Sequence, residues 1–174
     1  MPTELLFLTH LVLGYAAWLL CFYAYILPWL RAMDRAEAQR AIATFHSFRF
    51  FGLVFILPGV VGADLPAGFA TSAAFGDFAT GVLALLALLT FRIRLLFWLF
   101  VVAFNLVGMT DLVVDYFLAI RAGLPAQAGE LGGAYGIVII YVPLLMITQI
   151  AAFYLMARRQ PQAARTIAGE PVTS

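Results

Sequence analysis

Apolar stretches about as long as a membrane is thick recur along this chain of 174 residues. A helix needs roughly 20 predominantly apolar residues to cross the hydrocarbon core of a bilayer. Five stretches near that length, separated by turn residues and arginines, cover residues 5–29, 45–61, 71–91, 95–120 and 134–156. The sequence therefore predicts an all-α integral membrane protein, with one domain over residues 1–157 formed by a bundle of five transmembrane helices.

The composition agrees with lipid as the main solvent of the fold. Hydrophobic residues make up 64% of the chain and charged residues 11%, whereas soluble domains carry about 25% charged residues. A water-soluble core of this length would not bury so much apolar surface. Residues 158–174 are polar, with Pro161 and Pro171 and no apolar periodicity, and we expect them to form a disordered cytoplasmic tail.

The arginines predict the orientation, because short cytoplasmic loops are enriched in basic residues. All ten basic residues are arginines, and only Arg121 falls on one side of the expected topology. The other side holds Arg31, Arg35, Arg40, Arg49, Arg92, Arg94, Arg158, Arg159 and Arg165. This bias places the N-terminus outside and the C-terminus in the cytoplasm, with a plasma membrane (the bacterial inner membrane) as the expected location. On this interpretation the nine arginines only orient the protein.

Several function classes lack the residues they need. There is no lysine for Schiff-base chemistry, and the single Cys21 excludes an intramolecular disulfide. The two histidines, His10 and His46, fall in opposite leaflets of the expected topology, so they do not suit a shared haem. The sequence predicts no metal site and no nucleic-acid partner, and it names no cofactor.

Ionisable residues inside a membrane span are costly and are candidates for function by default. His10, Asp77 and Asp111 are the candidate catalytic residues. At 1.5 Å per residue, they and Asp115 lie roughly 7–14 Å from the outer ends of their predicted helices. A shared site predicts that His10, Asp77 and Asp111 converge, whereas purely structural roles predict that each meets a different neighbour.

Polar residues on the fourth predicted helix form one stripe. Asn105, Gly108, Asp111 and Asp115 fall within an arc of roughly 120° at about 100° per residue, and we expect the stripe to face the bundle interior. Asn105 and Asp115, with Tyr141 and Gln149 of the fifth helix, are candidate ligand-binding residues. A structural alternative pairs Asp115 with Arg121 in the headgroup region and makes Asn105 an interhelical hydrogen-bonding residue.

His46 and Arg49 are a second candidate site, in the sequence TFHSFRFFG. They are three residues apart on one helical face, near the expected cytoplasmic end of the second span. Because a guanidinium matches phosphate geometry, the pair is a candidate site for an anionic headgroup. The alternative is that Arg49 extends to the interface without a specific ligand.

Three functions remain open on this evidence. The first is an interior pocket for an apolar small molecule (isoprenoid, sterol or quinone-like) whose polar end is built from Asp and His, for binding or acid–base chemistry. The second is a cation or proton pathway. The third is a non-catalytic subunit of a larger membrane complex, binding a pigment or haem through one histidine. Expected partners are membrane lipid, the apolar molecule, and further copies or subunits.

Overall fold

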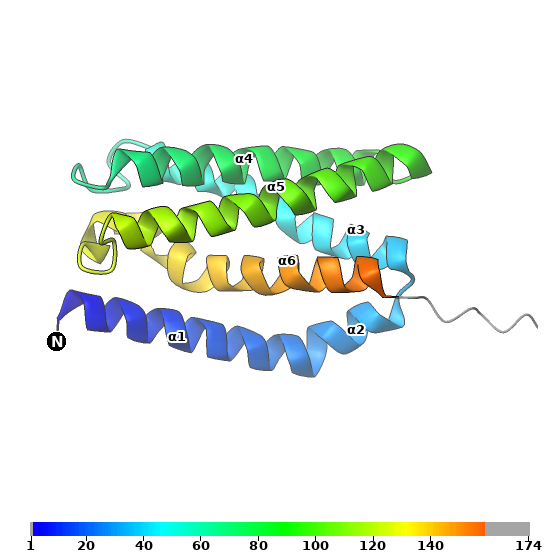
Figure 1. Cartoon of the computed structure of the whole chain (residues 1–174), viewed down its shortest axis with the longest axis horizontal. Helices are drawn as coiled ribbons and strands as arrows, with labels where there is room; N and C mark the ends of the chain where they lie inside the picture. The colour runs from blue at the N-terminus through cyan, green and yellow to red at the C-terminus, as the bar shows by residue number, and fades with distance from the viewer. Residues whose placement is uncertain (1, 159–174) are drawn as a thin grey trace, which may run out of the picture.

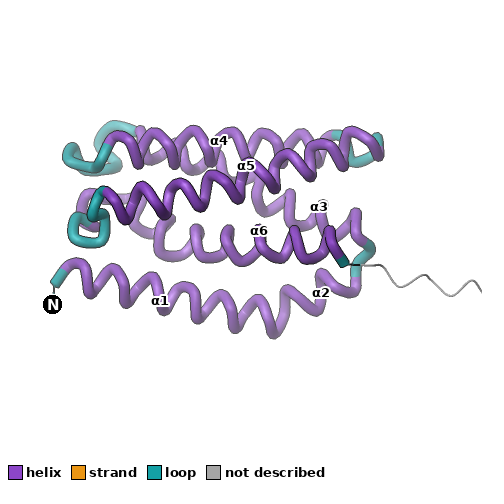
Figure 2. The backbone as a smooth tube through the Cα atoms, in the orientation of Figure 1, coloured by secondary structure: helices purple, strands orange, loops and turns teal. Residues whose placement is uncertain are grey.

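A computed structural model describes residues 2–158, which form an elongated bundle of helices with no strand in that range (Figure 2). The chain passes along the long axis and reverses direction at each turn (Figure 1). The elements in order are α1 (Thr3–Cys21), η1 (Phe22–Ile26), α2 (Leu27–Ala32), α3 (Arg35–His46), η2 (Ser47–Ile56), α4 (Ala67–Leu89), α5 (Arg94–Arg121), η3 (Ala128–Ala134), η4 (Ile137–Tyr141) and α6 (Val142–Ala157). The expected disordered tail lies outside the described residues, apart from Arg158.

Four helical segments are long and apolar enough to cross a membrane: Thr3–Ala32, Ala67–Leu89, Arg94–Arg121 and Ile137–Ala157. They are compatible with a membrane-embedded protein. The second of the five expected spans is not among them, because that pass consists of the polar helix α3 followed by the 3₁₀ helix η2. Its 12 α-helical and 10 3₁₀ residues rise roughly 38 Å, close to the roughly 35 Å of the 23-residue α4.

The second pass begins ten residues earlier than the expected Phe45. Asp34 caps α3, and its carboxylate accepts a hydrogen bond of 2.9 Å from the backbone N–H of Glu37. An acidic or hydroxyl residue followed three positions later by Glu is a typical helix start. Residues after Phe45 therefore lie deeper in the bundle than the sequence interpretation assumed.

Prolines locally widen two of the passes. The π-helical segment η1 ends two residues before Pro28, and η4 ends two residues before Pro143. Proline lacks an N–H and its ring clashes with the carbonyl four residues earlier, so a turn with five-residue spacing relieves the clash. The carbonyl of Ile140 accepts a hydrogen bond of 2.8 Å from the Trp18 indole of α1.

Two hydrophobic clusters fill the ends of the bundle and leave a polar zone between them. Along α4, Ala74 belongs to one cluster and Ala84 to the other. Asp77, which lies between them, belongs to neither and is 5% exposed. On α5, Asp111 similarly follows the buried Phe104 of one cluster and precedes Leu118 at the edge of the other. The buried aspartates Asp77 and Asp111 thus lie between the two clusters, in the middle of the bundle.

Candidate functional site in the bundle interior

The 3₁₀ helix η2 directs Arg49 into the protein. A 3₁₀ helix has three residues per turn, so side chains three positions apart are eclipsed on one face. His46, Arg49, Gly52 and Phe55 follow that spacing and all four are buried. Phe48 and Phe51, on the other faces, are 50% and 55% exposed. The local helix type therefore presents Arg49 to the interior and Phe48 and Phe51 to the outside.

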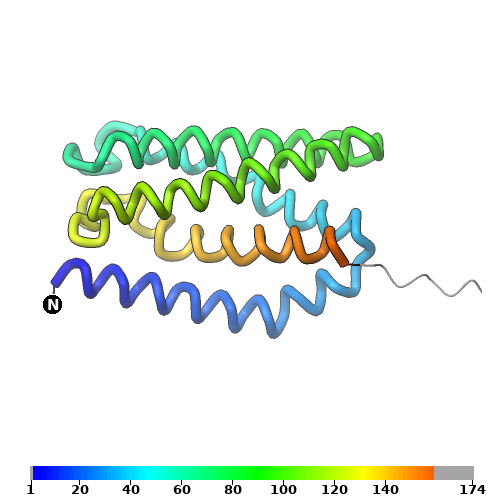
Figure 3. The backbone as a smooth tube through the Cα atoms, in the orientation of Figure 1, coloured from blue at the N-terminus to red at the C-terminus, as the bar shows by residue number. Residues whose placement is uncertain are grey.

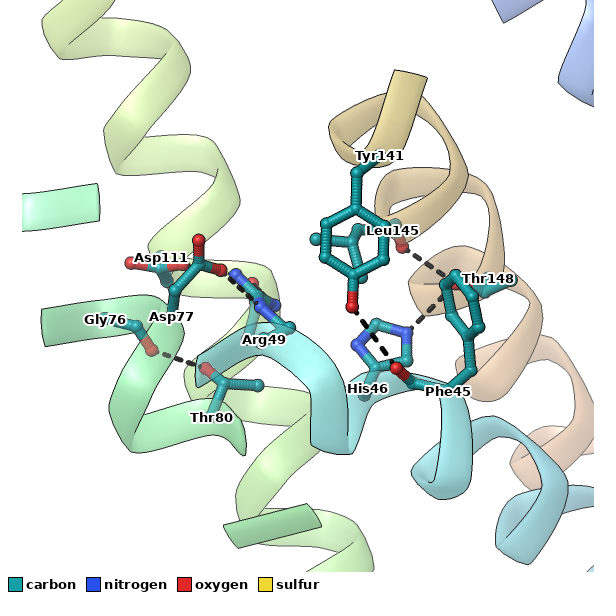
Figure 4. A network of polar contacts seen from close by, with 11 residues as sticks. Phe45, His46, Arg49, Gly76, Asp77, Thr80, Asp111, Tyr141, Leu145 and Thr148 are labelled. Atoms are coloured by element: carbon teal, nitrogen blue, oxygen red, sulfur yellow. Dashed lines mark hydrogen bonds and ion pairs between the residues drawn. The ribbon is translucent and has the colours of Figure 1, made fainter. Parts of the chain in front are cut away.

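Arg49 is bound to two aspartates from two other helices (Figure 4). Its Nε donates to Asp77 Oδ1 of α4 at 2.6 Å, and its Nη2 donates to Asp111 Oδ2 of α5. Nη1 donates to the carbonyl of Gly108 at 3.3 Å. We call Arg49, Asp77 and Asp111 the ionic centre. Their side chains are 0%, 8% and 5% exposed, so the three charges depend on one another for compensation.

Glycines on three helices make room for the ionic centre. A Cβ atom at Gly52 would overlap the side chain of Asp77, and one at Gly76 would overlap the carboxylate of Asp111. A Cβ at Gly108 would lie 2.8 Å from Nη1 of Arg49. Glycine is the residue that permits such close approach between helices in a membrane. The ionic centre is therefore built into the backbone packing of η2, α4 and α5.

His46 lies beside Arg49 and contacts α6 (Figure 4). Its Nε2 is 3.0 Å from Thr148 Oγ1. The Tyr141 hydroxyl donates to the carbonyl of Phe45 at 3.3 Å. Nδ1 of His46 is buried, and it has no hydrogen-bond partner among residues 2–158. His46 and Tyr141 thus tie η4 and α6 to the end of α3, while one imidazole nitrogen stays free.

Amide side chains extend the polar zone towards the arginine-rich end of the bundle. Gln149 Nε2 donates to Asn105 Oδ1 at 2.7 Å and to the Asn105 carbonyl at 3.1 Å. Asn105 Nδ2 lies 3.4 Å from Gln39 Oε1, and Gln39 Nε2 donates to the Ala152 carbonyl at 2.8 Å. The three amide residues are fully buried. They bind one another directly, as expected for an interhelical hydrogen-bond network.

An apolar cavity of about 210 Å³ adjoins the ionic centre on the side of the N-terminal end of the bundle. Phe7, Leu11, Phe55, Phe69, Leu112 and Leu124 are among the residues that line it. Asp77 and Asp115 supply its carboxyl groups, and Tyr116 its hydroxyl. The Tyr116 hydroxyl is 2.5 Å from that of Tyr15. Asp115 Oδ1 is buried without a hydrogen-bond partner in the described chain.

The structure brings together only part of the expected catalytic set. Asp77 and Asp111 converge, but on Arg49. His10 lies apart from them, with its Nδ1 2.8 Å from the Tyr135 hydroxyl. In the described range Asp115 forms no ion pair with Arg121, whose guanidinium lies 5.3 Å from the centre of the Phe117 ring.

Residues 6–157 match a protein family described as a domain of unknown function (DUF8737). The chain belongs to this family. The matched range contains the ionic centre, the amide network and the residues that line the cavity. No curated protein and no solved structure matches the chain.

Sequence reasoning missed the role of Arg49 in this DUF8737 chain. We expected the arginine at the cytoplasmic interface, as an orienting residue or with His46 as an anionic headgroup site. Both side chains are fully buried, and Arg49 is already bound to two carboxylates. These two residues therefore leave no free guanidinium for an anionic headgroup. The helix-start signal at Asp34 and Glu37 would have indicated that Arg49 lies deep in the bundle, because Arg49 follows Asp34 by about four turns of helix.

Proposed function

We propose that the chain is a plasma-membrane protein of five transmembrane helices, with its N-terminus outside and its C-terminus in the cytoplasm. The length of the α3–η2 pass, which is close to that of α4, supports a fifth span. Of the described arginines, only Arg121 lies near the end of the bundle that holds the N-terminus. The opposite end of the bundle holds the α2–α3 turn, the α4–α5 turn and the end of α6 (Figure 1). In or near these segments lie Arg31, Arg35, Arg40, Arg92, Arg94 and Arg158. With Arg49 assigned to the interior, the bias remains strong.

We further propose that the apolar cavity binds a small apolar molecule that carries a hydrogen-bond-donating head. The observation that supports this function best is an apolar cavity in which a buried carboxylate oxygen, Asp115 Oδ1, has no partner. A buried polar atom without a hydrogen bond costs about 1–3 kcal/mol, and a bound donor would remove that cost. A carboxyl oxygen accepts hydrogen bonds whether or not the group is ionised. An isoprenoid alcohol, a sterol or a quinol would supply the missing donor.

In this proposal the aspartates have different roles. Asp115 accepts the hydrogen bond of the ligand head. Asp77 lines the same cavity but is held by Arg49 through Oδ1, so it positions the head and keeps the wall of the cavity charged. Asp111 holds the other side of the guanidinium. Asp115 is also the residue placed to take a proton from a hydroxyl group. His10 has no role in this cavity.

Lipid extraction and mass spectrometry of the purified full chain test the proposal. We expect wild type to carry a hydroxylated apolar molecule that organic extraction releases. Ala119→Phe fills the cavity from its wall and should lower the amount recovered several-fold. Ala79→Phe adds the same ring at an exposed position of α4 and should leave recovery unchanged. Equal recovery from both variants, or no such molecule in wild type, would refute the cavity as a binding site.

A second candidate function, a proton or cation pathway, is favoured by the charge of the ionic centre. One guanidinium faces two carboxylates, so the group carries a net charge of −1 when both are ionised. Neutrality then requires a proton or a bound cation. The amide network continues from this centre towards the opposite end of the bundle. Proteoliposomes that contain Asp111→Asn should lose proton flux relative to wild type, and unchanged flux would exclude the ionic centre as the pathway.

A further inference from the structure

A second apolar feature lies on the outside of the bundle, between the first pass and α6. It is a groove of about 370 Å³ whose walls include Leu19, Phe22 and Leu27 on one side and Ile147, Ile150 and Ala151 on the other. Arg31 and Tyr154 lie at one end. None of these residues belongs to the ionic centre or to the apolar cavity. The groove is therefore separate from both of these sites.

The local sequence explains why the groove is open. Pro28 follows the π-helical segment η1, and in Figure 3 the first pass bows away from α6 in this region before α2 returns towards it. Phe22, in the first turn of η1, is one of the groove residues. π-Helical turns often mark functional positions. The proline and the widened turn thus keep two neighbouring passes from closing on one another.

Arg31, at the end of the groove, is linked by hydrogen bonds to Arg158 and through it to Arg35. Arg31 Nη2 donates to the Tyr154 hydroxyl at 3.1 Å, and its guanidinium lies 5.3 Å from the centre of that ring. Arg158 Nη1 donates to the Arg31 carbonyl at 3.3 Å, and Arg35 Nη2 donates to the Arg158 carbonyl at 2.5 Å. These contacts fix the arginines to neutral groups and leave their charges uncompensated.

No carboxylate neutralises this arginine cluster within residues 2–158. The ion pairs of the described chain involve only Arg40 and Arg49. Moreover, Arg35 Nε is buried and has no acceptor in that range. Guanidinium groups on neighbouring elements that lack an acidic partner suit a phosphate, which accepts several N–H donors at once.

We propose that the groove binds an anionic phospholipid, with one acyl chain along the apolar walls and the phosphate on Arg31, Arg35 and Arg158. Leu19 and Arg31 are twelve residues apart, or about 18 Å along the helix. One leaflet of a roughly 30 Å hydrocarbon core is about 15 Å thick, so the groove spans one leaflet and ends where a headgroup lies. This site is independent of the ligand proposed for the apolar cavity.

Native mass spectrometry of the full chain with phosphatidylglycerol or phosphatidylcholine of identical acyl chains tests the proposal. We expect phosphatidylglycerol to be retained preferentially. Arg31→Gln should reduce its retention about tenfold, whereas Arg94→Gln makes the same charge change at the same end of the bundle and should have little effect. Both arginines are exposed, so neither substitution should prevent folding.

A second pair of variants tests the groove itself. Ile150→Trp fills the groove from a position of α6 that is 56% exposed. The control Ile140→Trp adds the same side chain in η4, at a position that is 58% exposed. Only Ile150→Trp should lower phosphatidylglycerol retention. Equal retention of both lipids, or equal effects of the paired variants, would overturn the proposal. The proposal would also be overturned if wild type were a dimer that Ile150→Trp dissociates, because a second copy of the chain would then cover the groove.

Discussion

Asp111 and Asp115 are four residues apart on α5, yet they belong to different regions of the molecule. Asp111 is part of the ionic centre, where Arg49 binds its carboxylate and Gly76 leaves room for it. Asp115 borders the apolar cavity, where one of its oxygens has no partner. Two aspartates on one helix thus differ: Arg49 binds the carboxylate of Asp111, whereas Asp115 keeps an oxygen without a partner.

This difference assigns Asp111 to the stability of the fold and Asp115 to the binding of a ligand. Buried charges that bind one another hold helices together, and removing Arg49 would leave its two carboxylates uncompensated. A buried carboxylate oxygen without a partner contributes no such contact and is available to a ligand. We therefore expect substitutions in the ionic centre to affect folding first and substitutions at Asp115 to affect ligand retention first.

The largest expected effect follows from Arg49→Leu. Two carboxylates would remain buried together without a cation, which typically costs about 3–5 kcal/mol. Unfolding of the purified variant in detergent, followed by circular dichroism against denaturant, measures the loss. The control Arg94→Leu removes an exposed arginine and should change stability little. If Arg49→Leu were as stable as this control, the ionic centre would not hold the fold together.

A triple variant sharpens the same comparison. Replacing Arg49, Asp77 and Asp111 together by leucine removes every charge at once. Exchanging a complete buried ion group for apolar side chains is often neutral or stabilising. We therefore expect the triple variant to recover much of the stability that Arg49→Leu loses, measured in the same way. Additive destabilisation by the three substitutions would contradict mutual compensation of the charges.

Asp77→Asn should have a smaller effect than Arg49→Leu. It replaces the charged acceptor of the 2.6 Å hydrogen bond from Arg49 Nε by a neutral amide oxygen, and the loss should be below the about 1.5–3 kcal/mol that a hydrogen bond to a charged group is worth. Arg49 and Asp111 remain as a neutral pair, so no charge is left without a partner. Denaturant unfolding should place this variant between wild type and Arg49→Leu. A loss as large as that of Arg49→Leu would mean that Asp111 alone does not compensate the arginine.

Gly76→Ala tests whether the backbone spacing of α4 is fitted to the ionic centre. The added methyl group would overlap the Asp111 carboxylate, and overpacking of this kind costs about 1–3 kcal/mol. Gly68→Ala is a control on the same helix, because a Cβ there meets nothing within 4 Å. Thermal unfolding should separate the two variants. Equal melting temperatures would show that Asp111 can move away without cost.

The smallest expected change in stability is that of Asp115→Asn. Because one carboxylate oxygen has no partner, we expect a smaller loss of stability than for Asp77→Asn, together with a several-fold loss of the extractable apolar molecule. Comparing denaturant unfolding with ligand recovery on the same preparation checks both. If stability fell as far as in Asp77→Asn while recovery stayed constant, Asp115 would belong to the structural region and not to the binding region.

The sequence alone was sufficient for the class of fold and for which face of α5 is polar. Apolar stretches of membrane-spanning length predict long apolar helices, and four such helices are present. Regular α-helical periodicity places Asn105, Gly108, Asp111 and Asp115 on one face of α5; the first three are buried and Asp115 is half-buried. These are consequences of one local geometry, the 100° turn per residue of an α-helix, and so they need no knowledge of neighbouring helices.

Only the tertiary structure decided which partners these residues meet. His10 and Asp77 share a predicted depth, but depth does not determine which helices are adjacent, and His10 meets Tyr135 instead. Arg49 resembled an interfacial arginine because the second pass was assumed to start at Phe45. The change to a 3₁₀ helix at Ser47 turns it into the bundle, and glycines on three separate helices make room for its partners. Partner choice depends on packing between segments distant in sequence, which local patterns do not encode.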